Sequence, residues 1–460
     1  MSSRATSETA LPTQTPLDAS VAEQPIQQDA MPHPWSGWLR AGFRLAFCYL
    51  GGYCLFSGNA TVWNAIPFAG YWIQSVVARV FALPAEYLAK NVFHVAPPGN
   101  MLHLTGSGDT AINWISALLL LVVSLVATGA WTVLDRSRPH YQTLSAWLRF
   151  LIRLTLGMGM VSYGISKIFP LQMPQPSLSS LSEPLGMHSP MSVLWNFIGL
   201  NPWYESICGA AEFLAGVLIL FRRTALAGAL FTAFVVSNVL LYNLAFDVPV
   251  KLYSGHLLLL ACFVVLPDVA ALWRFFWRHE PAAPTGVWVP PAKRSWFRRA
   301  TQTIEIAFAL VIIAPSVYFG AVRWRQQRAE LAAPCPLCSA WRVDSESNET
   351  TTVHLPSPFS GVVSELIIDS PTLAVLRGPA YQPSYVLIKI DDASKTIQAS
   401  QGVDTLFAFT QPDPMHLVLR PIGDKAGKAE TIGFVRTTPI GGYPLIHRGS
   451  HWVSEYPYQR

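Results

Sequence analysis

Residues 203–221, WYESICGAAEFLAGVLILF, and residues 224–246, TALAGALFTAFVVSNVLLYNLAF, decide the fold of this chain. Each stretch is apolar over roughly 20 residues, which is the length of α-helix that crosses a lipid bilayer. Only Arg222 and Arg223 separate the two stretches, so they predict two antiparallel membrane helices joined by a tight basic turn. Comparable apolar segments occupy residues 41–58, 111–134, 148–169, 254–277 and 301–320. The sequence therefore predicts a mostly α-helical, polytopic membrane bundle of about seven spans.

The composition excludes an ordinary soluble protein. The 460 residues are 51% hydrophobic and only 13% charged, whereas soluble domains contain about 25% charged residues. The net charge of +5 is small, and no basic patch with interleaved aromatic residues indicates binding to nucleic acid. We therefore expect the lipid bilayer as the main partner and no nucleic-acid partner.

Lysine and arginine residues gather at one set of span ends, and this sets the predicted orientation. These basic clusters lie at residues 40–44, 136–153, 222–223 and 274–299. Because basic residues stay on the cytoplasmic side of membrane proteins, the clusters predict a cytoplasmic N-terminus in a bacterial inner membrane. With seven spans, the C-terminal domain is then periplasmic. Three arginines, Arg323, Arg325 and Arg328, oppose this orientation, but the segment 274–299 is the stronger signal.

Five regions follow from the changes in composition. Residues 1–34 predict a disordered tail because they are rich in Ser, Thr, Pro and Gln and lack hydrophobic periodicity. The others are an N-terminal transmembrane or interfacial region at 35–134, a transmembrane core at 135–278, a basic loop and last helix at 279–325, and a β-rich soluble domain at 326–460. Within the second region, the amphipathic residues 62–83 fit either a helix lying in the membrane interface or a segment that re-enters the bundle.

The C-terminal region predicts a small all-β domain. Short β-branched runs, such as 362–369, 385–391 and 416–420, are separated by Pro, Gly, Asp and Ser. Between two of these runs, Asp391-Asp392-Ala393-Ser394 predicts a hairpin turn.

Polar side chains inside the apolar spans are the first candidate site residues, because lipid disfavours them unless a partner or a cavity receives them. Glu212 lies near the middle of residues 203–221, and Glu205 precedes it by two helical turns on the same face. Glu212 is interpreted either as a proton-carrying or quinone-binding carboxylate, or as a structural carboxyl paired with a basic or amide group. Lys167 either joins such a site or extends its ammonium group to the interface.

Three further polar residues stand at the end of residues 224–246. Asn243, Asp247 and Lys251 are spaced four apart, and Pro249 interrupts the helix between the last two. They either line a polar pocket at the mouth of the bundle or form an Asp–Lys pair at a helix end broken by proline.

Cys335-Pro336-Leu337-Cys338 is the one close pair among the six cysteines. Outside the cytoplasm such a pair is expected to be oxidised, as either an inert or a redox-active disulfide. A zinc site needs a second pair of ligands at a suitable spacing, and a c-type haem site needs a histidine where Ser339 stands. We therefore expect no metal.

Several motifs carry a family resemblance. The more specific ones are Leu171-Gln172-Met173-Pro174, Asn201-Pro202-Trp203-Tyr204 and Asn243…Asp247-Val248-Pro249-Val250-Lys251. Supporting positions are Arg153…Gly157…Tyr163-Gly164…Lys167, Glu212-Phe213-Leu214-Ala215-Gly216 with Arg222-Arg223-Thr224, and the C-terminal Arg448…His451-Trp452-Val453-Ser454-Glu455-Tyr456-Pro457. On these residues the chain resembles a longer subgroup of the DoxX family of bacterial membrane proteins.

The resemblance implies a four-helix core and a link to redox chemistry. Some DoxX relatives are the membrane subunit of a thiosulfate:quinone oxidoreductase, and others act with thiol-redox or oxidative-stress enzymes. By this resemblance we expect a redox-associated component, linked to quinone or thiols, with a redox partner protein. Glu212, Lys167, Asn243, Asp247 and Lys251 would line its polar site, and Cys335 and Cys338 would exchange electrons. The alternative is a non-enzymatic scaffold or transporter-like protein that anchors the β domain.

Overall fold

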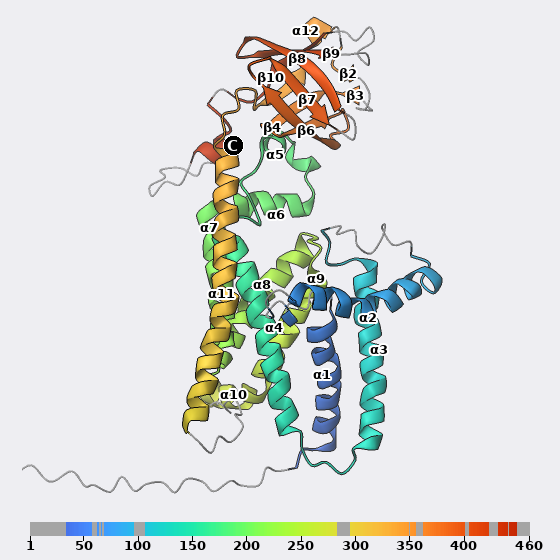
Figure 1. Cartoon of the computed structure of the whole chain (residues 1–460), viewed down its shortest axis with the longest axis vertical. Helices are drawn as coiled ribbons and strands as arrows, with labels where there is room; N and C mark the ends of the chain where they lie inside the picture. The colour runs from blue at the N-terminus through green and yellow to red at the C-terminus, as the bar shows by residue number, and fades with distance from the viewer. Residues whose placement is uncertain are drawn as a thin grey trace, which may run out of the picture.

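The chain forms a helical bundle with a β-barrel stacked on one end of it (Figure 1). The structure is a computed structural model that describes residues 34–57, 62–63, 66, 69–95, 106–282, 295–348, 350–355, 362–400, 404–422, 431–439 and 441–448. The predicted tail, apart from residue 34, and the C-terminal motif after Arg448 lie outside these ranges.

Five helical segments in the described part of the chain are long and apolar enough to cross a membrane. They are α3 (Ala111–Leu134), α4 (Gln142–Ile168), α7 (Pro202–Leu220), α8 (Ala225–Ala245) and the segment Lys251–Arg278, in which α9 (Lys251–Val265), the 3₁₀ turn η3 (Leu266–Asp268) and α10 (Val269–Arg278) follow one another. By length and composition these helices fit the predicted membrane bundle, but the predicted number of about seven spans is too high.

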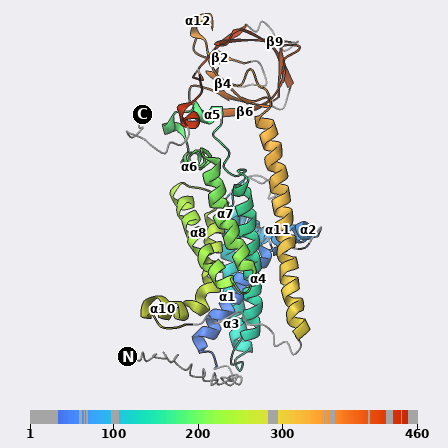
Figure 2. The same ribbon diagram turned by 90° about the vertical axis from the view of Figure 1, so that its left-hand side faces the viewer.

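The two predicted spans outside this set are nevertheless helical. Residues 41–58 fall largely in α1 (Gly37–Phe56), and residues 301–320 fall in α11 (Ser295–Leu331). Arg40 and Arg44 leave only the second half of α1 apolar, which is shorter than the roughly 30 Å hydrocarbon core. Helix α11 begins in the basic segment, contains Pro315 and ends in a basic turn. Both run along the bundle, α1 against α3 and α4, and α11 against α4 and α7 (Figures 1 and 2).

Helices α4 and α7 pack against each other more extensively than any other pair of described helices. Glycines on both helices permit the close approach. A Cβ atom on Gly164 would lie 2.5 Å from the backbone nitrogen of Phe213, and one on Gly209 would lie 2.6 Å from the carbonyl oxygen of Gly164. The α4–α7 contact is therefore a backbone-to-backbone contact that tolerates no larger residue at these points.

Helix α2 (Gly70–Asn91) lies across the bundle axis, at the end of α3 nearer the barrel (Figure 1). It exposes a row of apolar and aromatic side chains, which comprises Tyr71, Trp72, Val76, Val80, Leu83 and Tyr87. This orientation and this surface fit a helix in the membrane interface, which is one of the two structures left open for residues 62–83.

The C-terminal all-β domain is confirmed as a closed antiparallel barrel of eight strands. Around the barrel the strands are β1 (Ala340–Val343), β10 (Ile432–Arg436), β9 (His416–Ile422), β8 (Asp404–Asp413), β7 (Thr396–Ser400), β6 (Pro383–Asp391), β5 (Leu373–Arg377) and β4 (Glu365–Ser370). Strands β2 (Val353–His354) and β3 (Val362–Val363) form a separate pair. The short helix α12 (Ser345–Asn348) packs against β10, and α13 (Pro444–His447) follows β10 in the chain. Alternate residues point inward and form an apolar core.

Two local features of the β domain bear on its predicted limits. Helix α11 continues to Leu331, six residues past the predicted boundary at 325, and the barrel begins only at Ala340. The predicted hairpin turn lies between β6 and β7, where Asp391 Oδ1 accepts hydrogen bonds from the backbone nitrogens of Ala393 (3.0 Å) and Ser394 (3.3 Å). The turn prediction is therefore confirmed.

The loop between α4 and α7 attaches the barrel to the bundle. This loop contains α5 (Leu178–Leu181), the 3₁₀ turn η2 (Leu185–Met187) and α6 (Pro190–Gly199). Ser179 donates hydrogen bonds to Asp369 from its backbone nitrogen (2.8 Å) and its hydroxyl (2.6 Å). The buried Arg377 donates to the carbonyl oxygen of Ser179 (2.7 Å). We call Ser179, Asp369 and Arg377 the barrel clamp; α5 lies beneath β4 at this point (Figure 2).

Candidate functional site

A buried ion pair joins α4 and α7. The ammonium group of Lys167 contacts Glu212 Oε1, and each of the two residues is only 4% exposed. Lys167 stands in the last turn of α4 and Glu212 in the middle of α7, and the glycine contacts between these helices bring the two side chains together. The structure thus pairs two of the predicted site residues with each other.

Glu205 adds a second buried carboxyl on the same face of α7. It is 0% exposed, and its Oε1 accepts a hydrogen bond from the backbone nitrogen of Met173 at 3.0 Å. Its Oε2 has no hydrogen-bond partner among the described residues. The two-turn spacing from Glu212 in the sequence indicated this shared face. The structure shows in addition that a backbone N–H of the α4–α7 loop donates to one oxygen of Glu205.

A small cavity, which we call the bundle cavity, opens beside the ion pair. Its polar lining consists of Tyr163, Lys167, Gln172, Glu212, Tyr242, Asn243, Tyr253 and Ser254. Its volume is about 40 Å³, which is enough for ordered water but well below the roughly 150 Å³ of a cavity that accommodates benzene. In this conformation the bundle cavity has room for water and not for a quinone ring.

Asn243 is the third predicted residue at this cavity, and its orientation is fixed. Its Nδ2 donates to the hydroxyl of Ser254 (3.1 Å), and that hydroxyl donates to the carbonyl oxygen of Val250 (2.9 Å). Since the hydroxyl proton is used in this way, Asn243 must present its amide NH₂ to Ser254. Its Oδ1 then has no partner among the described residues, although Asn243 is only 1% exposed.

The other two predicted residues, Asp247 and Lys251, lie apart from the bundle cavity. Lys251 Nζ stands 2.7 Å from Asp247 Oδ1, and the side chain of Asp247 is 82% exposed. Between them the chain leaves α8 and begins α9, as the position of Pro249 predicted. This is the Asp–Lys pair at a broken helix end, the second of the two interpretations of this segment.

Asp109 completes that helix end. Its carboxylate accepts hydrogen bonds from the backbone nitrogens of Lys251 (2.8 Å) and Leu252 (2.9 Å), so it caps the start of α9. The contact links residues more than 140 positions apart, and the local sequence around Asp109 carries no signal of it.

His256 is a buried polar residue that sequence reasoning missed. Its ring stacks on that of Tyr53, with centroids 3.9 Å apart. Its Nδ1 lies 2.7 Å from the carbonyl oxygen of Leu252, which can only accept, so Nδ1 carries the proton. With the ring proton on Nδ1, Nε2 accepts a hydrogen bond from the hydroxyl group of Tyr49, 2.8 Å away. The available signal was the four-residue spacing of Tyr49 and Tyr53, which places both on one face of α1.

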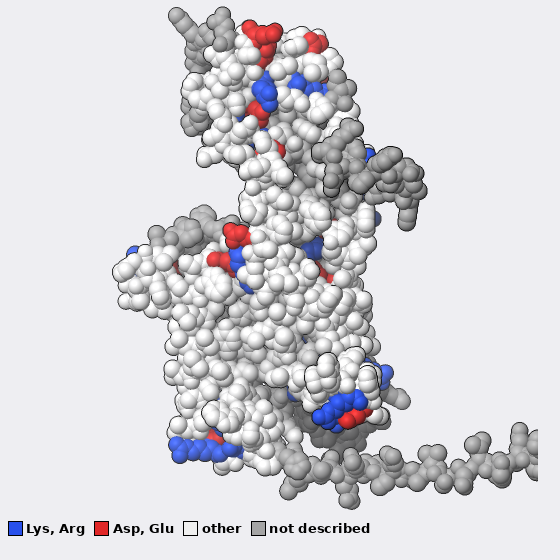
Figure 3. All heavy atoms as spheres, turned by 180° about the vertical axis from the view of Figure 1, so that it is seen from behind, with Lys and Arg blue, Asp and Glu red and all other residues white. Residues whose placement is uncertain are grey.

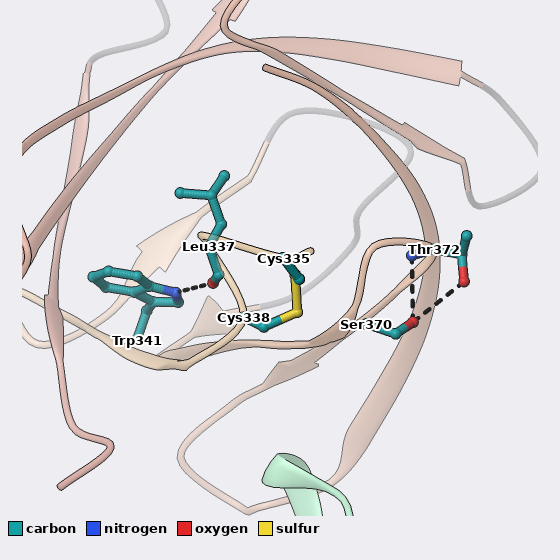
Figure 4. The surroundings of a disulfide bond; sticks show 6 residues. All are labelled: Cys335, Leu337, Cys338, Trp341, Ser370 and Thr372. Carbon is teal, nitrogen blue, oxygen red and sulfur yellow. Dashed lines mark hydrogen bonds between the residues drawn. A yellow bond between two sulfur atoms is a disulfide. The ribbon is translucent and has the colours of Figure 1, made fainter. Parts of the chain in front are cut away.

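The predicted cysteine pair forms a disulfide between Cys335 and Cys338 (Figure 4). Both cysteines are half-buried and lie in the loop that joins α11 to β1. Between them, Leu337 is buried with the barrel core, and its carbonyl oxygen accepts a hydrogen bond from Trp341 Nε1 at 2.9 Å. The described free cysteines, Cys48, Cys54, Cys208 and Cys262, all stand in bundle helices.

Charge is distributed unevenly along the molecule. Lysine and arginine side chains gather at the end of the bundle away from the barrel, and the flank above them is almost uncharged in this view (Figure 3). At that end Arg40 donates hydrogen bonds to the carbonyl oxygens of Arg136 (3.4 Å) and Arg138 (3.0 Å), which joins the ends of α1 and α3. The uncharged flank fits contact with lipid acyl chains.

Comparison with known proteins leaves the family of this chain undetermined. No family model matches it, and no solved structure matches it. The chain is 29% identical over 131 residues to a Bacillus subtilis (strain 168) protein named "Uncharacterized protein YwoB". The aligned segment covers 28% of this chain and 81% of that protein, whose name states no activity.

Proposed function

We propose that this chain is a DoxX-like, redox-associated membrane component that exchanges electrons with thiols through Cys335 and Cys338. The observation that carries the proposal is the position of the disulfide. It closes a half-exposed loop outside the bundle, whereas the described free cysteines stand in the helices. A disulfide between cysteines three positions apart is of the type that exchanges readily with other thiols.

The charge distribution supports placing this disulfide in the periplasm. The arginine-rich end of the bundle lies opposite to the barrel, and such ends face the cytoplasm (Figure 3). The barrel and its disulfide then face an oxidising compartment, in which a disulfide persists until a specific reductant reaches it. The inner membrane of a bacterium provides this arrangement.

The proposed reaction is a thiol–disulfide exchange with a dithiol protein. A thiolate of that protein attacks one sulfur of the Cys335–Cys338 bond, forms a mixed disulfide and releases the other cysteine as a thiolate. The second thiolate of the partner then attacks the mixed disulfide and releases the first cysteine. The partner leaves as a disulfide, and this chain gains two electrons and two protons. The thiol version is favoured over the quinone version because the bundle cavity is too small for a quinone ring.

A labelling experiment on intact cells tests the proposal. We expect a membrane-impermeant maleimide to label the wild-type chain only after mild reduction. The double variant Cys335→Ser/Cys338→Ser keeps the four helical cysteines and should stay unlabelled under both conditions. Labelling that requires permeabilised cells would overturn the periplasmic placement.

A trapping experiment tests the exchange itself. The single variant Cys338→Ser leaves Cys335 as a free thiol, whose thiolate attacks the disulfide form of the partner in the reverse exchange and releases one partner cysteine as a thiolate. Because Cys338 is no longer present to resolve it, this mixed disulfide should be detected after acid quenching and should disappear on reduction. If neither single variant traps a protein, and the double variant supports wild-type growth under thiol stress, the disulfide is structural.

The alternative function is a scaffold that holds the barrel at the membrane. The observation in its favour is the barrel clamp, which fixes the barrel to the α4–α7 loop through the buried Arg377. A scaffold would keep its function in Cys335→Ser/Cys338→Ser and also in Glu212→Gln, provided that both variants reach the membrane in normal amounts.

A further inference from the structure

The buried charged residues around Lys167 do not balance in charge, because the other buried cation of α4, Arg153, stands fourteen residues earlier and donates to the carbonyl oxygens of Ile219 and Leu220. Lys167, Glu205 and Glu212 are each at least nine-tenths buried, and they comprise one ammonium group and two carboxyls. Lys167 forms an ion pair with Glu212, whereas Glu205 accepts a hydrogen bond from the backbone nitrogen of Met173. A buried charge without a compensating charge is strongly disfavoured, so this cluster requires one more positive charge than its side chains supply.

The groups that face this cluster supply no such charge. The other titratable groups around it are Tyr163 on α4, Cys208 on α7, Tyr242 on α8 and Tyr253 on α9. Tyrosine and cysteine are neutral or negative in their two protonation states. A proton or a bound cation must therefore neutralise the second carboxyl.

Three unpartnered oxygens are associated with the cluster. Glu205 Oε2, Glu212 Oε2 and Asn243 Oδ1 are buried acceptors without a hydrogen-bond partner among the described residues. Glu212 and Asn243 both line the bundle cavity, which is large enough for water. Buried acceptors are normally satisfied, so these oxygens indicate that the site receives hydrogen donors from outside the chain.

We propose that Glu205, Lys167, Glu212 and Asn243 form a membrane-buried proton site with one exchangeable proton and ordered water. Glu205 holds the proton, because Glu212 is already neutralised by the ammonium group of Lys167. A water in the bundle cavity donates its two hydrogens to Glu212 Oε2 and Asn243 Oδ1. This proposal is independent of the cysteine chemistry, since it concerns different residues in a different part of the molecule.

The geometry favours a proton over a metal cation. The described part of the chain holds no group of three or more His, Cys, Asp or Glu residues arranged to bind a metal. The ammonium group of Lys167 already contacts Glu212 and would repel a second cation there. A proton adds a donor to a buried carboxyl without needing a coordination shell.

We expect the proton of Glu205 to exchange with water at the barrel end of the bundle. Gln172, Met173 and Trp195, all from the α4–α7 loop, line the bundle cavity together with Lys167. Trp195 Nε1 donates a hydrogen bond to the carbonyl oxygen of Gln172 at 3.1 Å, and the backbone nitrogen of Met173 donates one to Glu205. Opening of this loop would let water reach Glu205, and the proton would leave to that water as hydronium.

Infrared difference spectroscopy of the full chain in lipid nanodiscs tests the proposal. At neutral pH we expect one C=O stretching band of a protonated carboxyl, which shifts in D₂O because the proton exchanges. Glu205→Gln should remove this band, and Glu330→Gln, which changes an exposed carboxyl at the end of α11, should leave it in place. Replacement of sodium by choline should not alter it.

The wild-type spectrum alone can overturn the proposal. Absence of a protonated-carboxyl band at neutral pH, a band that does not shift in D₂O, or a band that depends on sodium would each contradict it. A band that survives in a folded Glu205→Gln variant would place the proton elsewhere and contradict the assignment. If Glu205→Gln does not fold, Lys167→Met offers the second test, since loss of the ammonium group should add a second protonated-carboxyl band from Glu212.

Discussion

At the scale of single residues, the ion pair between Lys167 and Glu212 is buried between two helices, whereas the one between Lys251 and Asp247 is largely exposed at a helix end, where Lys251 also lies 3.9 Å from Asp109. Lys167 and Glu212 are both enclosed by the bundle, whereas the side chain of Asp247 is mostly in solvent. Removal of one partner of a buried pair leaves an uncompensated charge, and removal of one partner of an exposed pair leaves a hydrated one. The two pairs therefore allow a matched comparison.

We predict that Lys167→Met destabilises the protein by roughly 3–5 kcal/mol, and that Lys251→Met costs less than about 1 kcal/mol. The double variant Lys167→Met/Glu212→Leu should recover most of the loss, because no charge is then left buried. Unfolding of the purified proteins in detergent at fixed lipid content measures all three. Equal losses in Lys167→Met and Lys251→Met would show that burial does not control the strength of these pairs.

Asp391 provides a prediction outside the membrane. Hydrogen bonds from the hydroxyl and the backbone nitrogen of Ser394 and from the backbone of Ala393 lower the pKa of this carboxyl. The folded state thus favours the carboxylate, so its stabilising effect is complete above the unfolded pKa of about 4 and is lost as the pH falls through the lower folded pKa.

We therefore expect Asp391→Asn to flatten the loss of barrel stability below about pH 4, because asparagine keeps an acceptor oxygen and does not titrate. Calorimetric melting of the full chain at a series of pH values measures this. Asp404→Asn, at the start of β8, is the control. In this variant the dependence of barrel stability on pH should match that of the wild type. An unchanged slope in Asp391→Asn would remove this carboxyl from the acid response.

At the scale of elements, the α4–α7 contact depends on glycines that meet backbone atoms of the facing helix. Because backbone cannot rotate away as a side chain can, a methyl group at such a point must push the helices apart. Gly129 of α3 has nothing within 4 Å of its added Cβ position, so the same substitution there has room. The two positions separate a packing effect from a general effect of alanine on helices.

Gly164→Ala is expected to destabilise the bundle by about 1–3 kcal/mol, and Gly129→Ala should be neutral or stabilising by up to about 1 kcal/mol. Thermal unfolding of both variants in the same detergent gives the comparison. Gly164→Ala should also loosen the Lys167–Glu212 pair and so change the carboxyl infrared bands. A Gly164→Ala variant as stable as wild type would mean that α4 and α7 are farther apart than described.

The sequence revealed elements whose signal is local and missed contacts that join distant segments. Continuous apolar runs predicted α3, α4, α7, α8 and α9. The turn at Asp391 could be predicted because its hydrogen bonds join residues that are adjacent in the sequence. The meeting of His256 with Tyr53 and the capping of α9 by Asp109 depend on helices that are far apart in the chain. The number of spans was overestimated because an apolar run was counted regardless of the charges at its ends, as in α1.

At the scale of the whole molecule, the barrel clamp ties the barrel to the loop that also covers the bundle cavity. Asp369 and Arg377 hold Ser179 on the barrel side. Asn196 Nδ2 donates to the Ser180 hydroxyl at 2.7 Å and so connects α5 with α6, the helix that carries Trp195. A continuous set of contacts thus runs from the barrel to the lining of the cavity.

We predict that Asp369→Ala releases α5 from the barrel, because two hydrogen bonds to a charged acceptor are lost, each worth about 1.5–3 kcal/mol. Hydrogen–deuterium exchange of the full chain should become faster in residues 177–183 and, if the contacts act together, in residues 190–199. Asp392→Ala, in the exposed β6–β7 turn, should leave both segments unchanged. Wild-type protection of residues 177–183 in Asp369→Ala would show that Asp369 does not hold α5 and that Arg377 is sufficient.

The barrel clamp also constrains how the protein is made. Ser179 is synthesised about 190 residues before Asp369, so the ribosome must complete the barrel strands β4 and β5 before α5 has anything to bind. Until then the nascent bundle presents an α5 without its partner, and a chain that stops after α11 never acquires one. Quality-control proteases at the membrane would therefore find truncated chains accessible at residues 177–183, and completion of the barrel would be the step that conceals this segment.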